Sequence, residues 1–65
     1  MKDMIATYDL KQLKSYKGYE IWKIWDVTFS GRKVNIQYEV ADEDDAIDFF
    51  KTLAEARAFI DNVLV

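Results

Sequence analysis

The chemistry-bearing residues that stand out in this 65-residue sequence are six carboxylates within ten consecutive positions. No Lys or Arg interrupts the run, which comprises Glu39, Asp42, Glu43, Asp44, Asp45 and Asp48. Hard oxygen ligands of this type suit Ca²⁺ or Mg²⁺. An EF-hand loop, however, needs a glycine at its sixth position, and no glycine follows Gly31. The pattern therefore favours a solvated acidic turn over a metal site, and we expect no cofactor.

Catalysis is limited by what the composition lacks. The chain has no Cys and no His, which removes thiol nucleophiles, imidazole bases and the usual zinc ligands. Neither Ser15 nor Ser30 lies in a glycine-framed turn that would place it beside an oxyanion hole. A carboxylate in a solvated turn also lacks the burial that raises its pKa for acid catalysis. We expect no enzymatic activity.

An antiparallel hairpin is predicted over residues 19–29 and 33–41. From Val34 to Val40 apolar and polar residues alternate, as in a strand with one buried face. Within residues 19–29 every odd-numbered position is apolar apart from Lys23, and Ser30-Gly31 separates the two runs as a turn. A two-residue loop there pairs residues whose numbers sum to 61, and this register puts the apolar partners on one face. The predicted pairs are Val27 with Val34, Trp25 with Ile36, and Ile21 with Val40.

A helix is predicted over residues 53–64, because Thr52 and Glu55 have the spacing of a capping box and an apolar stripe follows. Residues 46–51 are interpreted as a third strand, with an early helical turn from Asp45 as the alternative. The spacing of Leu10, Leu13 and Tyr16, followed by Gly18 as a cap, predicts a short helix over residues 8–17. Together these elements predict one compact α+β domain spanning residues 1–65.

The predicted register directs Trp22 and Ile24 away from the helix, opposite Glu39 and Gln37. Two interpretations are open: the N-terminal segment covers these apolar side chains, or they form a contact patch rimmed by charge. The inward aromatic residues are expected to be Tyr19, Trp25, Phe29, Tyr38 and Phe59.

Lys23 falls at an inward position, opposite Tyr38. Either a bulge at Trp22-Lys23 re-aims the strand, or the lysine stem packs inside while its amine reaches the edge. We favour the bulge.

Charge is distributed unequally along the chain, although the net charge is only −3. Residues 1–38 carry seven Lys or Arg and four acids, whereas residues 39–65 carry two and eight. The acidic run is interpreted either as a solubilising surface or as an anionic patch for a cationic partner. In the second case the carboxylates would stand where nucleic-acid phosphates bind.

The sequence also indicates where the protein acts. No apolar run approaches the roughly 18 residues of a membrane-spanning helix, and the Met1-Lys2-Asp3 start lacks an apolar signal core. We expect a cytoplasmic protein of a bacterial host, without membrane attachment.

Two segments carry a resemblance to known proteins: residues 16–21, YKGYEI, which lead into the hairpin, and residues 50–61, FKTLAEARAFID. They resemble small acidic proteins of phages and mobile elements. The arrangement of a three-stranded sheet and a helix is also similar to the N-terminal modules of phage-type integrases and to AP2-like domains. In the DNA-binding relatives the sheet face opposite the helix enters the major groove. The corresponding positions here are Glu20, Trp22, Ile24, Asp26, Thr28, Lys33, Asn35, Gln37 and Glu39.

These observations lead to one leading functional hypothesis. The chain is expected to be a non-catalytic, protein-binding inhibitor or decoy, anti-CRISPR-like by analogy, acting on a host or phage protein with a basic surface. It is expected to be a monomer or homodimer. Nucleic acid is not the expected partner, because the carried-over positions include three acids and one Lys. A sheet-face DNA-binding module and an accessory domain are the alternatives. The expected binding residues are Glu39, Asp42, Glu43, Asp44, Asp45, Asp48, Trp22 and Ile24.

Overall fold

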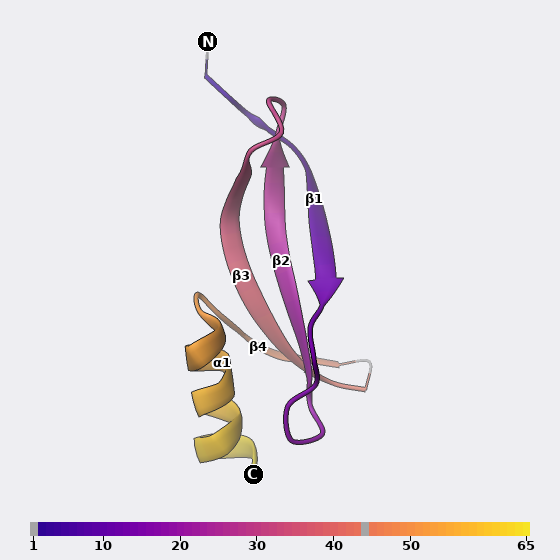
Figure 1. Ribbon diagram of the computed structural model, residues 1–65, viewed down its shortest axis with the longest axis vertical. Coiled ribbons are helices and arrows are strands. Elements are labelled where there is room, and N and C mark those ends of the chain that lie inside the picture. The colour runs from indigo at the N-terminus through magenta and orange to yellow at the C-terminus, as the bar shows by residue number, and fades with distance from the viewer. Residues whose placement is uncertain (1, 44) are drawn as a thin grey trace.

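The computed structural model describes residues 2–43 and 45–65 as an antiparallel sheet with a helix at its C-terminal end (Figure 1). The strands lie in chain order, and each is hydrogen-bonded to the next. The elements are β1 (Ile5–Gln12), β2 (Glu20–Thr28), β3 (Lys33–Asp42), β4 (Asp45–Phe50) and α1 (Leu53–Phe59), which continues as a π-helical segment (Ile60–Leu64). The α+β class is confirmed, with four strands where about three were predicted.

The prediction of a helix over residues 8–17 is wrong. This part of the chain forms most of β1 and leads into a tight turn at Lys17-Gly18. β1 pairs with β2, with Leu10 opposite Ile24. Every residue of β1 is exposed, so the strand has no alternation of buried and exposed side chains that a sequence pattern could reveal. Gly18 does not cap a helix. It forms a two-residue turn with Lys17, and both residues have positive φ, as a type I′ hairpin turn requires.

The predicted hairpin of residues 19–29 and 33–41 is confirmed as β2 and β3. At the end near the helix the residue numbers of each pair sum to 61, as in Ile21 with Val40. Near the turn the sum is 60, so Val27 faces Lys33 instead of the predicted Val34. The reason is a three-residue loop, 29–31, closed by the Thr28 N–H donating to the carbonyl of Arg32 at 3.0 Å.

A β-bulge in β3 restores the predicted register. Between Asp26 and Ile24 the facing segment of β3 contains one residue more than β2. Asn35 lies in this bulge with φ of 53°, a conformation that Asn tolerates better than most residues. Its side-chain amide donates to Asp26 Oδ2 at 2.9 Å. The predicted pairing of Trp25 with Ile36 is therefore replaced by the bulge.

The prediction of a bulge at Trp22-Lys23 is wrong, since Lys23 pairs with Tyr38 in the register of its neighbours. Its half-buried side chain lies on the same side of the sheet as Trp25, with Nζ 5.9 Å from the indole ring centroid. Lys33 Nζ lies 4.8 Å from the same ring. The lysine stems thus help to cover an indole that the helix does not reach, and the amines remain near water.

The core lies between the sheet and the helix at one end of the molecule. Ile21 and Val40 of the sheet pack against Ala56 and Ile60, and all four are essentially inaccessible to solvent. Burying each of the larger aliphatic side chains contributes about 1.5–3 kcal/mol. Phe29, predicted to point inward, is 75% exposed because it belongs to the β2–β3 loop.

The helix begins where the sequence predicts. The Thr52 hydroxyl accepts a hydrogen bond from the Glu55 N–H at 3.1 Å, which is one half of the predicted capping box. Phe50, at the end of β4, packs against Phe59 with ring centroids 5.0 Å apart. No helix within the described ranges has the length and apolar content needed to span a lipid bilayer.

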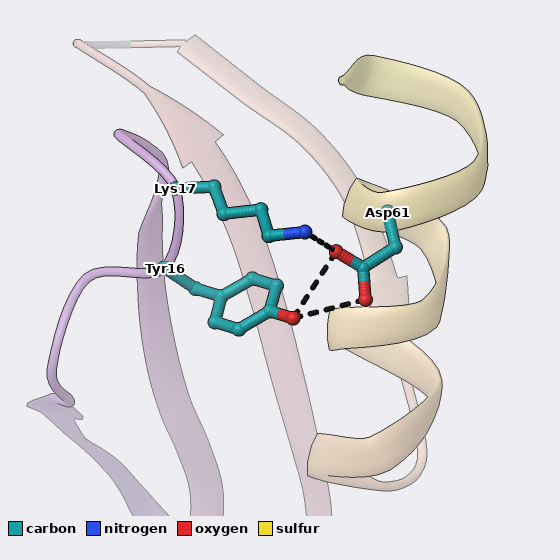
Figure 2. Close-up of polar contacts among 3 residues, drawn as sticks. All are labelled: Tyr16, Lys17 and Asp61. Atoms are coloured by element: carbon teal, nitrogen blue, oxygen red, sulfur yellow. Dashed lines mark hydrogen bonds and ion pairs between the residues drawn. The ribbon is translucent and has the colours of Figure 1, made fainter.

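The β1–β2 turn is fastened to the helical segment by polar contacts (Figure 2). The Tyr16 hydroxyl lies 2.9 Å and 3.1 Å from the two carboxylate oxygens of Asp61, and the Lys17 amine forms an ion pair with the same carboxylate. The Tyr16–Asp61 contact joins residues 45 positions apart in the chain. The turn is therefore positioned by the C-terminal segment as well as by its own two strands.

Candidate binding face

The face of the sheet opposite the helix carries the candidate site. Ile21 and Val40 point toward the helix, so the alternation of side chains along each strand directs Trp22, Ile24 and Glu39 to the other side. Cross-strand pairing aligns one row across all strands, in the order Gln12, Trp22, Glu39 and Phe49. The neighbouring row is Leu10, Ile24 and Gln37. We call this side of the sheet the groove face.

A shallow open groove of about 230 Å³ lies on the groove face, lined by Leu10, Trp22, Ile24 and Glu39. The Trp22 indole N–H donates to Glu20 Oε1 at 2.9 Å, which fixes the ring with its polar atom satisfied. Leu10, at the β1 side of the groove, is 46% exposed, and apolar surface continues past Glu39 to Phe49, which is 50% exposed.

Trp22 and Ile24 were expected either to be covered by the N-terminal segment or to form an exposed contact patch, and their surroundings combine features of both. The N-terminal segment lies beside β2 as a strand, so Leu10 flanks the two side chains without covering them. Both are half-buried. They form the floor and wall of a groove that remains open to solvent.

The five predicted acidic residues that the structure describes do not gather into one patch. Glu39 lies in the groove beside Trp22. Asp42 faces Asp45 across the β3–β4 turn, with Glu43 between them, at the end of the sheet. Asp48 pairs with Val40 and so lies on the helix side of β4, and Asp44 lies outside the described residues. Across residues 2–43 and 45–65, no group of three or more potential ligands is arranged to hold a metal ion.

The paired strand positions of the groove face carry acids and no cation, whereas the helix side carries lysines together with Asp9 and Asp48. Glu20, Asp26 and Glu39 occupy the groove face, and none of its paired strand positions is a Lys or Arg. Lys33, the one cation among the positions suggested by the DNA-binding resemblance, lies opposite Val27 and over the Trp25 ring on the helix side. The three-residue loop thus places on the helix side the one cation that the resemblance had put on the groove face.

Sequence reasoning missed two contributors to this face, Leu10 and Phe49, and it placed Glu20 on the face without counting it among the binding residues. Leu10 was assigned to a helix, so its place beside Ile24 could not be anticipated. Phe49 could have been predicted, because side chains alternate along the predicted strand of residues 46–51. Phe49 and Phe50 must therefore point to opposite sides of the sheet. Glu20 has the same facing as Trp22 in the predicted hairpin, two residues away, which is the spacing that permits the observed hydrogen bond.

A second, wider hollow of about 710 Å³ lies at the other end of the sheet, lined by Lys2, Asp3, Met4, Phe29 and Ser30. Its carboxylate is already engaged. Hydrogen bonds from the Ser30 hydroxyl and N–H hold the pKa of Asp3 below its ordinary value of 3.8. This hollow offers no unpaired carboxylate to a ligand, and the groove face is the better candidate.

Comparisons with known proteins identify no relative of this chain. No protein-family model matches the chain, and no curated protein or solved structure is significantly similar to it.

Proposed function

We propose that this protein is a non-catalytic binding module that holds a cationic, partly apolar segment of a partner protein on its groove face. In this role it acts as an inhibitor or decoy that occupies the basic surface of a nucleic-acid-binding partner. The observation that carries the proposal is the groove itself, where Glu39 lies directly beside Trp22 and Ile24. This pairing of a carboxylate with apolar walls supports recognition of a Lys or Arg side chain.

The groove provides both parts of such recognition. Trp22, Ile24 and Leu10 offer apolar contact to the stem of a long cationic side chain. Glu39 offers a charge-assisted hydrogen bond to its amine or guanidinium. The indole ring is already held by Glu20, so little side-chain entropy remains to be lost when a partner binds.

The acidic turn has a separate part in the proposal. Asp42, Glu43 and Asp45 lie at the end of the sheet and do not line the groove. Charges placed beside a binding site act mainly on the rate of encounter, through a field that falls off over about 10 Å at moderate salt. The turn would therefore steer a basic partner toward the groove without contributing specific contacts.

DNA binding through the same face is not supported by its residues. Phosphate recognition needs several cations that release counterions, and the groove face carries three acids and no Lys or Arg among its paired positions. We therefore do not retain the sheet-face DNA-binding alternative.

The two tryptophans allow a direct test of the face that binds. Trp22 lies on the groove face and Trp25 on the helix side, so their two indole N–H resonances report on opposite sides of the sheet. We expect a synthetic peptide of alternating Leu and Lys to shift the Trp22 resonance and leave that of Trp25 unchanged. The Trp22→Phe variant assigns the two signals. Replacement of Glu39 by Gln is expected to weaken binding of the peptide about tenfold, because a charge-assisted contact is lost.

Matched controls define the outcomes. Glu55→Gln removes the same charge from an exposed helix position and is expected to leave the affinity unchanged. A peptide of alternating Leu and Glu should not bind. The proposal is contradicted if the acidic peptide binds as well, if only Trp25 responds, or if duplex DNA at low salt shifts Trp22.

A further inference from the structure

β1 is an open edge of the sheet. It pairs on one side with β2, and its other side faces solvent along the whole strand (Figure 1). The helix packs against β3 and β4, at the other side of the sheet, so it does not obstruct this edge. An uncovered edge of eight residues is a template for pairing with another strand.

The backbone groups that this edge presents can be identified. The Leu13 N–H donates to the carbonyl of Ile21 at 2.8 Å, so the alternation of an antiparallel ladder turns the N–H groups of Tyr8, Leu10 and Gln12 away from β2. The Leu10 N–H has no backbone acceptor and donates instead to the neighbouring Asp9 Oδ1 at 2.8 Å. A side chain therefore occupies a position that an added strand would use.

We infer that β1 pairs antiparallel with β1 of a second copy of this chain, about a twofold axis at Leu10. Residues directly opposite each other must lie on the same side of the sheet, so the axis has to pass through a residue. An axis at Asp9 places the Asp9 carboxylates of the two copies opposite each other, and an axis at Lys11 does the same with the two Lys11 amines. An axis at Tyr8 leaves both charges facing uncharged residues. An axis at Leu10 pairs Asp9 of each copy with Lys11 of the other.

This register also relieves a strained arrangement within each chain. Lys11 lies directly opposite Lys23 across the β1–β2 pair, and like charges at such positions destabilise a sheet. In the dimer, Asp9 of the second copy lies on the other side of Lys11. The Leu10 N–H then donates to the Leu10 carbonyl of the second copy, and the Asp9 carboxylate that had capped it becomes available to the amine.

The other edge does not offer the same match. In β4 the Phe49 N–H is capped by Asp48 Oδ1 at 2.8 Å, just as the Leu10 N–H is capped by Asp9. However, β4 contains Asp45 and Asp48 and no cation, so two copies of it would bring four carboxylates together with nothing to neutralise them. The charge pattern selects β1.

Dimerisation at β1 joins two groove faces. Leu10 lies on the groove face at the edge of the sheet, so the two Leu10 side chains would meet and the apolar floors would become continuous. The pairing needs no other protein, so it stands or fails independently of the proposed binding function.

Analytical ultracentrifugation of the whole protein, from low micromolar to millimolar concentration, tests the inference. We expect a monomer–dimer equilibrium that Lys11→Glu abolishes, because Asp9 of each copy would then face a carboxylate. The swapped variant Asp9→Lys/Lys11→Asp restores complementary pairs in the same register and should regain the dimer. Lys51→Glu makes the same charge change beyond the end of β4 and should leave the equilibrium unchanged.

Each outcome is decisive. A protein that stays monomeric at millimolar concentration contradicts the inference. A dimer that survives Lys11→Glu, or that is lost in Lys11→Glu and not regained in the swapped variant, shows that the contact is elsewhere. Circular dichroism of each variant establishes that the fold is retained. In the dimer, hydrogen exchange at the Tyr8 and Gln12 amides should slow with increasing protein concentration.

Discussion

Asp61 is the residue that joins the C-terminal helical segment to the β1–β2 turn. The Lys17 amine and then the Tyr16 hydroxyl lower the pKa of its carboxyl from the ordinary value of 3.8, because both stabilise the charged form. A carboxyl with a lowered pKa in the folded state stabilises the fold above its unfolded-state pKa. That contribution is lost as the pH falls through the folded-state value. The effect of this contact on stability therefore belongs to the region below about pH 4.

Replacing Tyr16 by Phe tests this assignment. We expect the pKa of Asp61 to rise toward 3.8 while staying below it, because the Lys17 ion pair remains. The acid-dependent part of the free energy of unfolding should shrink correspondingly. Titration of the Asp61 carboxyl carbon by NMR measures the pKa, and Tyr8→Phe, on the exposed β1, serves as control. An unchanged pKa in Tyr16→Phe would mean that the hydroxyl does not bind the carboxylate in solution.

Lys23 shows where prediction at the scale of single residues stops. The alternation of residues 19–29 correctly placed this lysine on the inward side, opposite Tyr38. It could not show whether a bulge or a folded-back stem resolves the conflict, because both leave the same sequence pattern. The outcome depended on Trp25, whose ring the Lys23 and Lys33 amines approach and whose own indole nitrogen has no hydrogen-bond partner within the described residues.

At the scale of elements, the bulge at Asn35 decides what the groove face displays. It lies between the stretch of β3 whose pairs follow the predicted register and the stretch shifted by the three-residue loop. Because of this shift Lys33 lies on the helix side, and the groove face keeps only acids among its charged paired residues. The bulge thus confines the shifted register to the loop end of the hairpin, and Trp22 and Glu39 keep their predicted pairing.

Substitution of Asn35 tests the energetic role of the bulge. Asn35→Ala removes the hydrogen bond to Asp26 and puts a residue with little tolerance for positive φ at 53°. We expect the free energy of unfolding in urea to fall by about 1–2 kcal/mol. Asn35→Gly loses the same hydrogen bond but relieves the backbone strain, so it should be less destabilising than Asn35→Ala. If the Gly variant is the less stable of the two, Asn35 does not adopt positive φ in solution.

The elements that were predicted correctly are those with a local signal. Thr52 and Glu55 marked the start of the helix, and the alternation around Ile21 and Val40 fixed the pairing of β2 with β3 near it. β1 could not be recognised, because it is held by backbone pairing to a distant strand and all of its side chains are exposed. The groove was therefore predicted only in part: Trp22, Ile24 and Glu39 were expected to face the same way, but Leu10 was not.

At the scale of the whole molecule, the helix is too short for the sheet. Residues 53–64 span roughly 18 Å at the rise of an α-helix, whereas the molecule extends over 47 × 20 × 16 Å. The helix therefore covers one end, where Ile21 and Val40 are sealed from water, and leaves the end near the β2–β3 loop as a single layer (Figure 1). At that bare end, lysine stems and loop hydrogen bonds take the place of a second layer.

This arrangement predicts unequal stability along one strand. Trp22 and Asp26 both belong to β2, and the alternation of the ladder points the backbone N–H group of each toward β3. Both amides therefore belong to the same β2–β3 ladder. Trp22 adjoins the helix-covered core, whereas Asp26 lies in the single-layer end. Opening of the bare end exposes chiefly the Trp25 ring, whereas opening of the other end exposes the whole cluster under the helix. We therefore expect the Asp26 amide to exchange with solvent at least about tenfold faster, a difference of ~1.4 kcal/mol. Native-state hydrogen exchange by NMR, corrected for intrinsic rates, measures both amides in one experiment. Equal protection would show that the bare end unfolds only together with the core, and that the lysine-covered Trp25 is as effective as the helix in holding the sheet together.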